Sequence, residues 1–481
     1  MNTMRRNNSR RRMLPGAAAP GSAMRSFVKR IHFVGIGGVG MSGIAEVLHN
    51  LGYRVSGSDL KSSEIIRRLA AMGVRIFMGH AAEHARGADV LVLSSAVSAV
   101  NPEIAYARRC GVPVILRAQM LAELGRLKKT VTVAGSHGKT TTTSMAAMAL
   151  KAAGAEPTMI IGGQLKNIRS NVKLGLGDYL VAEADESDGS FLHLAPLVAV
   201  VTNIDNDHLD YHKSLDNLKK SFLSHLLRLP FYGAAVLCAD DRNLAGLMRR
   251  VTRPVITYGI RNKADWQAKN IKMEKNGTRF DVFYRGHRTG VLRLSTPGRH
   301  NVLNALGALA AGRFLGFDLA KLMKGLSDFR GVGRRLDRLG SAGGIEFIDD
   351  YGHHPTEITA TLEAVASLWK GKRTIAIFQP HRFSRTKLLA KDFGPAFKQA
   401  DFVYVMDIYA AGEKPMAGVS SKLILDSLRK CRVPCASLSG ALEAARHIRR
   451  GDVVLTLGAG DVWKIGEDLL RRVRSNLASP A

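Results

Sequence analysis

Short apolar runs alternate with amphipathic stretches along most of this chain, a pattern typical of strands that alternate with helices. The first runs, residues 31–34 and 54–59, enclose a stretch with helical spacing at 44–51, and further runs follow at 89–95 and 113–116. Strands separated by helices pair in parallel, with helices on both faces of the sheet. We therefore predict a small parallel-sheet domain that ends at about residue 127.

The same alternation continues through the rest of the chain. The next predicted strands are residues 131–134, 179–182, 197–202 and 234–238. Short alternating runs with Asn-Gly and Arg-Gly turns between 255 and 296 predict hairpins added to the sheet, and a helix is predicted at about 301–316. A glycine-rich stretch at 329–335 resembles a hinge. The last predicted strands, again of an open parallel sheet, are residues 345–349, 374–378, 402–406 and 453–457.

These patterns predict an α/β protein of three domains, preceded by a basic extension at residues 1–26 that we expect to be disordered. A Rossmann-like N-terminal domain at 27–127 is followed by a central mononucleotide-binding parallel sheet with a P-loop at 128–333. A C-terminal Rossmann-like α/β domain completes the chain at 334–481. Met24 is an alternative start of the protein.

Composition narrows the class of protein. At 481 residues the chain is too long for one core, and it has no uninterrupted apolar stretch of about 18 residues, so we predict no membrane span. Four scattered cysteines predict neither a disulfide framework nor a zinc site, and favour a reduced, cytoplasmic protein. The net charge of +30 is spread along the chain without a nucleic-acid-binding module, so we expect anionic small molecules rather than nucleic acid as partners.

One turn carries the most specific chemistry. Residues 135–141 read Gly-Ser-His-Gly-Lys-Thr-Thr, between the predicted strand 131–134 and a helical pattern. A strand that turns through glycines into a helix directs backbone N–H groups and the positive end of the helix dipole at one point, which suits phosphate. Lys139 can reach the outer phosphates of a nucleotide and Thr140 can hold Mg²⁺. The turn is shorter than the common G-x-x-x-x-G-K-[ST] loop because Val133 stands at its first glycine position.

Two polar loops follow predicted strands of the same sheet, at the edge where ligands of such sheets bind. Glu183 ends the first strand and is predicted to be a magnesium ligand or a water-holding acid near Lys139 and Thr140. The acids that follow fit either that role or a solvated loop: Asp185, Glu186 and Asp188. His208 lies in the second loop, within the acidic stretch 203–212, and is predicted to bind a metal or phosphate.

A second glycine loop follows residues 31–34. Gly35, Gly37 and Gly40 match G-x-G-x-x-G, and the next predicted strand ends in Asp59 about 20 residues later. This is the dinucleotide-type βαβ fingerprint. Taken alone, the first domain therefore predicts a nicotinamide-dependent oxidoreductase.

Several motifs together resemble one enzyme family. Residues 135–141, 183–188, 203–210 and 298–305 resemble, in this order, the motifs of the ATP-dependent Mur ligases of peptidoglycan synthesis. Residues 349–355 and 379–386 resemble the alanine-adding branch of that family, and the resemblance covers about residues 27–475. Sister branches carry a carbamylated lysine fourteen residues after the equivalent of His208, where this chain has Phe222, which also favours the alanine-adding branch.

The resemblance implies a reaction. L-Alanine would be joined to the lactyl carboxylate of UDP-N-acetylmuramate through an acyl phosphate, with release of ADP and phosphate. It also implies ATP as a substrate, Mg²⁺, and a cytoplasmic enzyme that is a monomer or homodimer.

It further implies the following roles for residues of this sequence. ATP would be bound by Gly135, Ser136, His137, Gly138, Lys139, Thr140, Thr141, Asn301 and Asp350, and Mg²⁺ by Thr140, Glu183 and His208. The UDP-sugar would be bound by Gly35, Gly37, Gly38, Gly40, Met41, Ser42 and Asp59. Alanine and the acyl end would be held by Tyr351, His353, Arg382 and, with a weaker match, Arg385. The catalytic set would be Lys139, Glu183, His208, Arg335, His353 and Arg382. Arg335 would contact phosphates and its neighbour Arg334 is expected to be a solvated charge.

Three alternatives remain at this point. A recycling ligase that attaches a tripeptide to the same sugar nucleotide would share the later motifs. An oxidoreductase would explain the first glycine loop but not the Gly-Lys-Thr turn. A nucleic-acid-binding P-loop protein would explain the net charge alone.

Overall fold

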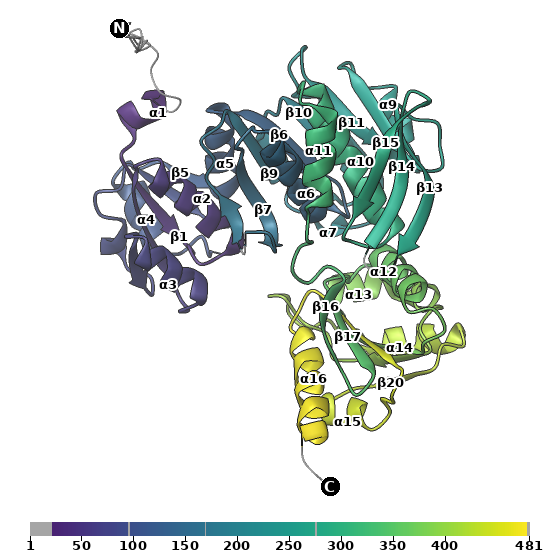
Figure 1. Ribbon diagram of the computed structural model, residues 1–481. Helices are drawn as coiled ribbons and strands as arrows, with labels where there is room; N and C mark the ends of the chain where they lie inside the picture. The colour runs from purple at the N-terminus through teal and green to yellow at the C-terminus, as the bar shows by residue number, and fades with distance from the viewer. Residues whose placement is uncertain (1–21, 95–96, 169, 275–276, 479–481) are drawn as a thin grey trace, which may run out of the picture. The chain divides into compact units, whose positions relative to one another are not determined.

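The computed structural model in Figure 1 describes residues 22–94, 97–168, 170–274 and 277–478. The described residues form two compact units, divided after Arg117, with one β-sheet in the first and two in the second. The predicted α/β class is confirmed, and the exact domain limits remain predictions. Most of the predicted basic extension lies outside the described residues, but residues 22–26 were expected to be disordered and instead belong to helix α1 (Ser22–Phe27).

The first unit contains a five-stranded, all-parallel sheet in the order β3-β2-β1-β4-β5. Its strands are β1 (Arg30–Val34), β2 (Arg54–Asp59), β3 (Arg75–Met78), β4 (Val90–Leu93) and β5 (Val114–Leu116). Its other helices are α2 (Val39–Asn50), α3 (Glu64–Ala71), the 3₁₀ helix η1 (Ala82–Ala85) and α4 (Pro102–Arg109), and α5 (Arg117–Arg126) follows. The strand order reverses at β1, so the glycine loop after β1 opens at the point where such sheets bind ligands.

The second unit begins with a ten-stranded sheet in the order β15-β14-β13-β12-β11-β10-β6-β9-β7-β8. Its strands are β6 (Lys129–Ala134), β7 (Thr158–Leu165), β8 (Ser170–Lys173), β9 (Tyr179–Glu183), β10 (Val198–Val201), β11 (Ala234–Cys238), β12 (Val255–Gly259), β13 (Trp266–Glu274), β14 (Gly277–Tyr284) and β15 (His287–Leu294). The helices between them are α6 (Lys139–Ala152), η2 (Ser190–His193), α7 (Leu209–His212), α8 (Leu215–Leu227) and α9 (Arg242–Met248), followed by α10 (Arg299–Phe314) and α11 (Leu319–Ser327). The predicted hairpins are confirmed, because β13, β14 and β15 pair antiparallel at one end of this sheet.

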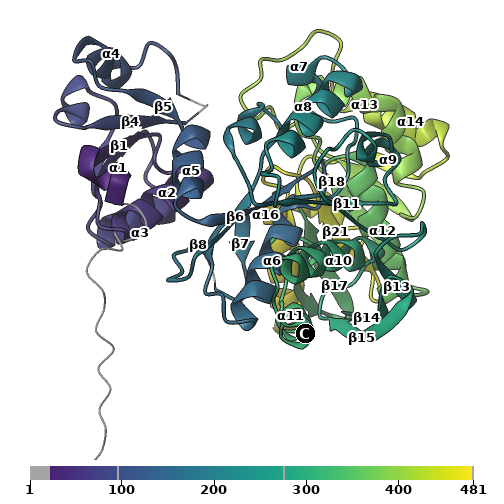
Figure 2. The ribbon, with the colours of Figure 1, turned by 90° about the horizontal axis from the view of Figure 1, so that it is seen from above.

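Strand β6 occupies the position on which the site depends. It pairs in parallel with β9 on one side and with β10 on the other, so three carboxyl ends lie next to one another. Every residue of β6 after Lys129 is buried. Helix α6, which follows β6, packs against α10 and α11 (Figure 2). Because α6 and α10 are buried along almost their whole length, their apolar and small residues continue around the helix instead of forming one stripe.

The third sheet has the order β16-β17-β21-β18-β19-β20. Its strands are β16 (Asp337–Ala342), β17 (Ile345–Asp350), β18 (Thr374–Phe378), β19 (Phe402–Val405), β20 (Cys435–Ser437) and β21 (Val453–Leu457), and its helices are α12 (Pro355–Leu368), α13 (Phe383–Ala396), α14 (Lys422–Lys430), α15 (Ala441–Ala445) and α16 (Trp463–Ala478). The predicted parallel sheet is correct for five strands, but β16 adds an antiparallel edge through the tight turn after Ala342. Within the described ranges, no helix has the length and apolarity needed to cross a membrane.

A buried carboxylate connects several elements of the first unit. Glu103, at the start of α4, lies 2.6 Å from His32 Nε2 on β1 and 2.7 Å from His80 Nδ1 after β3, and it accepts a hydrogen bond of 3.0 Å from Ser58 on β2. Burial raises the pKa of Glu103, but the bonds from His32, Ser58 and His80 outweigh it and leave the pKa below its usual value. The carboxylate therefore joins three strands to one helix.

We predict that Glu103→Gln lowers the stability of the first unit by about 3 kcal/mol near neutral pH, because it removes the charge from a buried network. A lowered pKa means that this stabilisation is present above the unfolded value of about 4.3 and is lost as the pH falls through the folded value. Hydrogen exchange of β1 and β2 should therefore be faster in the variant at neutral pH, with a smaller difference in acid. The control is Glu83→Gln, an exposed carboxylate on η1. Equal exchange in both variants would contradict this role.

Candidate nucleotide-binding and ligation site

The phosphate loop after β6 is held by residues that follow β10. Thr202 donates a hydrogen bond of 2.6 Å to the carbonyl of His137, and the Asn203 side chain accepts one of 2.9 Å from the N–H of the same residue. Gly135 and Gly138 have φ of +131° and +80°, values that L side chains rarely adopt. The loop therefore has a fixed backbone, directed at the N-terminus of α6 as predicted.

Lys139 lies across this loop. Its Nζ donates to the carbonyl of Gly135 at 2.7 Å and to Glu186 Oε1 at 2.8 Å. Burial would lower the pKa of Lys139, but the charges of Glu186, Asp185 and Glu183 raise it instead. The Lys139 amine is therefore charged and lies at the loop that we predict to bind phosphate.

Glu186 is not in a solvated loop, which was one of the two alternatives for it. Its side chain is fully buried, and its Oε2 has no hydrogen-bond partner among the described residues. Its Oε1 lies 3.8 Å from His208 Nε2, and burial raises its pKa to about 7. The sequence did not reveal this, because the burial of Glu186 depends on tertiary contacts. One of them is the hydrogen bond of 2.7 Å from the His212 ring to the Glu186 carbonyl.

Three side chains predicted as metal ligands come from the ends of adjacent elements. Glu183 ends β9 beside Val133 of β6, and its Oε2 accepts from Gly162 N–H at 2.9 Å. Thr140 is buried in the first turn of α6. Burial lowers the pKa of His208, which leaves the neutral imidazole that metals require. With the unpartnered Oε2 of Glu186, this donor set fits a divalent cation that prefers oxygen ligands.

A cavity of about 420 Å³ opens beside the loop. Its lining includes His137, Gly138, Thr141, Asn301, Asn304, Arg335 and Asp350. Asn304 Nδ2 donates to Asn301 at 3.2 Å, and its own oxygen lies so close to Gly138 that a Cβ there would be 2.8 Å away. Asp350 accepts from the N–H groups of Leu336 and Gly352, and burial raises its pKa to about 6. Five of the residues predicted to bind ATP therefore line one cavity: His137, Gly138, Thr141, Asn301 and Asp350.

Two of the four residues predicted to hold the amino acid, Arg382 and Arg385, line a second cavity of about 560 Å³, and Tyr351 and His353 do not. It is lined by Asp207, His208, Arg382 and Arg385 among others. Arg385 donates a hydrogen bond of 2.9 Å to Oδ1 of Asp207, the residue that precedes His208. The His353 ring lies 5.5 Å from those of Tyr351 and His381, and burial lowers the pKa of His353 to about 3, which keeps it neutral.

The two adjacent arginines behave differently. Arg335 lies 3.5 Å from Glu357 and 5.0 Å above the Tyr351 ring, and it lines the first cavity. Arg334 was expected to be a solvated charge, which is wrong. Its guanidinium bonds Asp349 at 3.0 Å and the carbonyls of Gly458 and Gly460. It therefore braces the third sheet, since a partly buried guanidinium needs such partners.

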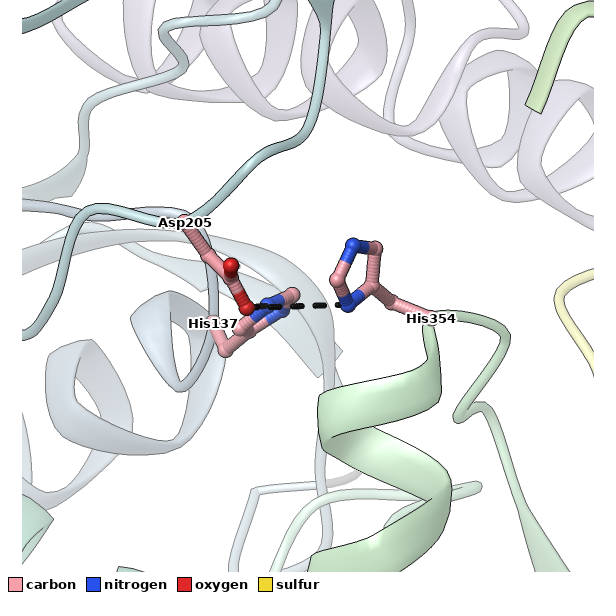
Figure 3. A group of neighbouring side chains, drawn as sticks. All are labelled: His137, Asp205 and His354. Carbon is pink, nitrogen blue, oxygen red and sulfur yellow. Dashed lines mark hydrogen bonds and ion pairs between the residues drawn. The ribbon is translucent and has the colours of Figure 1, made fainter. Parts of the chain in front are cut away.

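Figure 3 shows a group at which three possible metal ligands meet: His137, Asp205 and His354. His137 Nε2 lies 3.0 Å from Asp205 Oδ2, and His354 Nδ1 lies 3.7 Å from the same oxygen. Burial would lower the pKa of His137, but Asp205 and Glu357 raise it to about 9. These contacts favour a His137 imidazolium that is paired with two carboxylates.

In the first unit, the glycine loop is tied to the end of β2. Asp59 Oδ2 accepts from Gly37 N–H at 2.8 Å, and Gly35 has φ of +77°. A Cβ at Gly40 would lie 3.2 Å from Nη1 of Arg117, so a cation lies beside the loop. The sequence pattern did not indicate Arg117. Gly38 is exposed at the start of α2, whereas the side chains of Met41 and Ser42 are buried. The assignment of all these residues to a sugar nucleotide stays a prediction.

A phosphate loop at the switch point of a parallel sheet, with acids and a histidine on the neighbouring strand ends, defines a P-loop nucleotide-binding α/β protein. Three family models match most of the chain: "Mur ligase family, catalytic domain" at residues 30–129, "Mur ligase middle domain" at 133–312 and "Mur ligase, glutamate ligase domain" at 334–460. The chain belongs to the Mur ligase family, and the predicted resemblance is confirmed.

Relatives of known name narrow the comparison. The chain is 52% identical over 445 residues to a UDP-N-acetylmuramate--L-alanine ligase of Desulfosudis oleivorans, covering 92% of this chain and 97% of the relative. It is 51% identical over 442 residues to one of Endomicrobium trichonymphae, with 92% and 98% covered. Its structure resembles the UDP-N-acetylmuramate-alanine ligase of Thermotoga maritima with a TM-score of 0.78 and 31% identity, covering 93% and 99% of the two chains. A murein peptide ligase of Psychrobacter arcticus gives 0.68 and 26%, with 92% and 98% covered.

We predict that Gly138→Ala weakens nucleotide binding at least about tenfold, because the left-handed backbone and the nearby Asn304 oxygen both oppose a Cβ. The matched control is Gly154→Ala after α6, which has φ of +85° but no atom within 4 Å of the added Cβ. Both variants should lose about 1 kcal/mol of stability, but only Gly138→Ala should lose affinity for a fluorescent ATP analogue. Equal affinity in the two would show that the loop does not contact the nucleotide.

Proposed function

We propose that this protein ligates L-alanine to the lactyl carboxylate of UDP-N-acetylmuramate, with ATP as energy source, in the synthesis of peptidoglycan precursors. The observation that carries the proposal is the pair of cavities around the 203–208 loop, one beside the phosphate loop and one beside Arg382 and Arg385. The names of relatives about 50% identical over nearly their whole length support the same reaction.

The reaction has two steps. The carboxylate of the sugar nucleotide attacks the γ-phosphorus of ATP, the bond to the β-phosphate oxygen breaks, and ADP leaves behind an acyl phosphate. The amine of L-alanine then attacks the acyl carbon, inorganic phosphate leaves with the bonding electrons, and the amine loses a proton. Neither step needs a covalent bond to the protein, so positioning and charge neutralisation dominate catalysis.

The site residues divide this work as follows. Lys139, charged and in contact with the loop carbonyls, neutralises the β- and γ-phosphates, while the loop N–H groups and Arg335 surround them. Asn301 and Asp350 hold the adenosine in the first cavity. Arg382 and Arg385 bind the alanine carboxylate, for which a guanidinium fork is suited. Neutral His353, beside Tyr351, helps to orient the incoming amine.

Mg²⁺ fits the same site. Thr140, Glu183 and His208 would hold it, next to the unpartnered oxygen of Glu186. When bound, the ion would neutralise phosphate charge. The glycine loop of the first unit, with Arg117 beside it, binds the diphosphate of the sugar nucleotide, and Asp59 fixes that loop. We further propose that the enzyme is cytoplasmic and acts as a monomer or homodimer. The four free cysteines support a cytoplasmic location.

A second candidate is the recycling reaction, in which a tripeptide replaces L-alanine. The similarity to the murein peptide ligase favours this recycling reaction. The higher similarity to the alanine ligase structure favours the reaction with L-alanine more strongly. The two reactions share the acyl phosphate, so only the amine substrate distinguishes them.

We expect phosphate release from ATP to require both UDP-N-acetylmuramate and L-alanine. The measurement is a coupled phosphate assay with purified protein, in which L-alanine, the tripeptide, NADPH or DNA is the added component. Turnover that requires the tripeptide and ignores L-alanine would overturn the proposed substrate. Oxidation of NADPH would overturn the assignment to the ligases.

We expect Lys139→Ala to lower turnover by at least about 10³-fold, because it removes the cation nearest the transferring phosphoryl group. Binding of UDP-N-acetylmuramate, measured by calorimetry, should remain close to that of the unchanged protein. The control is Lys151→Ala at the exposed end of the same helix. Joint loss of sugar-nucleotide binding and turnover would mean that the two sites are not separate.

A further inference from the structure

Glu357 is the third residue of α12 and belongs to that helix's capping box. Its Oε2 accepts from the N–H groups of His353 at 3.0 Å and His354 at 3.3 Å, while the His354 ring accepts from Thr356 N–H. A capping box can be made equally well by glutamate or glutamine at this position. The helix-capping role of Glu357 therefore does not require its charge.

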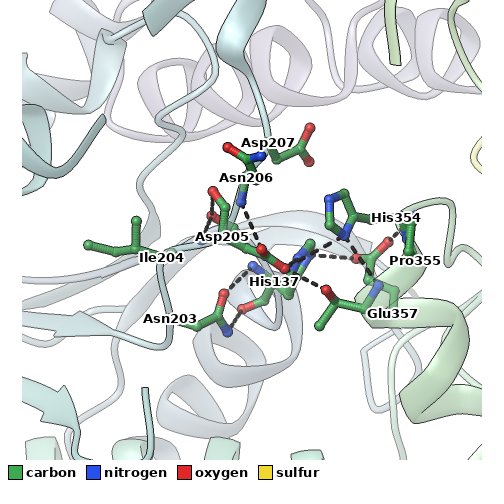
Figure 4. Close-up of polar contacts among 12 residues, drawn as sticks. His137, Asn203, Ile204, Asp205, Asn206, Asp207, His354, Pro355 and Glu357 are labelled. Carbon is green, nitrogen blue, oxygen red and sulfur yellow. Dashed lines mark hydrogen bonds and ion pairs between the residues drawn. The ribbon is translucent and has the colours of Figure 1, made fainter. Parts of the chain in front are cut away.

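The other carboxylate oxygen faces the phosphate end of the first cavity. Oε1 lies 3.4 Å from His137 Nδ1 and 3.5 Å from Arg335 Nη1. His137 is part of the phosphate loop, and its second ring nitrogen lies 3.0 Å from Asp205. Asp205, His137, Glu357 and Arg335 thus form one chain of charged groups, which we call the Glu357 cluster; Figure 4 draws its first three members.

The cluster joins segments far apart in the sequence. Asp205 follows β10 and His137 follows β6, whereas Arg335 and Glu357 belong to the segment that builds the third sheet. A second bond runs in parallel, from Thr356 Oγ1 to Asp205 Oδ2 at 2.5 Å. The start of α12 therefore contacts the phosphate loop through His137 and the loop after β10 through Asp205.

The charges of this cluster depend on one another. The groups that face His137 are Asp205, Glu357 and the ring of His354, whose centroid is 4.7 Å away. Burial lowers the pKa of His354 and leaves it neutral, so the two carboxylates alone stabilise the imidazolium of His137. For Glu357, burial raises the pKa, but the charges of His137 and Arg335 help to hold it well below its usual value.

We propose that Glu357 is a positioning residue for phosphoryl transfer, which aims the His137 imidazole and the Arg335 guanidinium at the outer phosphates of the nucleotide. The proposal rests on the proposed ligase function. Two cations held in advance around the transferring group stabilise charge without reorganisation during the step. The same carboxylate fixes the backbone of His353, so it joins the phosphate-binding groups to the loop expected to orient the amine.

The test is Glu357→Gln, which keeps the helix cap and removes the charge. We expect kcat to fall about 10–100-fold, with the KM for ATP changed less than about threefold, because the loss concerns groups that act in the transition state. The thermal midpoint should stay within about 2 °C of that of the unchanged protein, since the cap remains.

A pH profile separates this role from a structural one. In the unchanged protein His137, with a pKa of about 9, stays protonated through neutral pH. In Glu357→Gln its pKa should move toward the ordinary value of about 6.5, so activity should decline at a lower pH than before. Titration of the His137 ring by NMR measures this shift directly and does not depend on turnover.

The matched control is Glu363→Gln, an exposed carboxylate on the same helix that undergoes the same change of charge. His137→Gln repeats the test without touching the cap: kcat should fall, and adding Glu357→Gln should then lower it by a smaller factor than Glu357→Gln does alone, because only the contact with Arg335 remains to be lost. Unchanged kcat in His137→Gln, or kcat and pH profile in Glu357→Gln equal to those of the control, would overturn the proposal. Failure of the unchanged protein to use L-alanine would overturn the proposed function instead, and the NMR titration would still test the cluster.

Discussion

The position of β6 between β9 and β10 is the constraint on which the site depends. In a parallel sheet the three strands end at the same edge, so the phosphate loop, Glu183 and the 203–208 loop meet there although the sequence separates them by tens of residues. The loop itself has little freedom, because Thr202 and Asn203 bind its backbone on one side and the Asn304 side chain lies against Gly138 on the other. Rigid backbone N–H groups bind phosphate without a further loss of entropy.

Buried charge is concentrated around this loop and is paired almost everywhere. Lys139 pairs with Glu186, His137 with Asp205 and Glu357, and Arg385 with Asp207. Each pair joins groups from different segments of the chain, so the electrostatics of the site exist only in the folded chain. Removing one partner of such a pair leaves a buried charge without compensation, which costs stability. The same contacts also fix the positions of the paired side chains.

Much of the fold could be predicted from the pattern of apolar residues. Strands β11, β18 and β21 have the predicted limits, because each is a short and fully buried run. Strand β2 also has its predicted limits, although it is only partly buried. The pattern failed where burial is partial. Strand β7 has a short buried run at its start, but Gly162 and Gly163 interrupt it. Strands β8 and β16 consist mostly of polar and small residues and show no apolar run. Residues 22–26 read as a loop by composition but form the helix α1.

By itself, the sequence determined the α/β class, the phosphate loop and the family, because these depend on local spacing of glycines, lysine and acids along the chain. Only the tertiary structure decided which polar residues act together. Glu186 looked like one of three equivalent loop acids, and its burial against Lys139 depends on how residues 184–190 fold over the loop. The sequence pattern did not single out Glu357, and its contacts with His137 and Arg335 come from segments about 220 and 22 residues away. Such contacts leave no local pattern, because the pairing of distant strands, not the spacing of neighbours, brings them together.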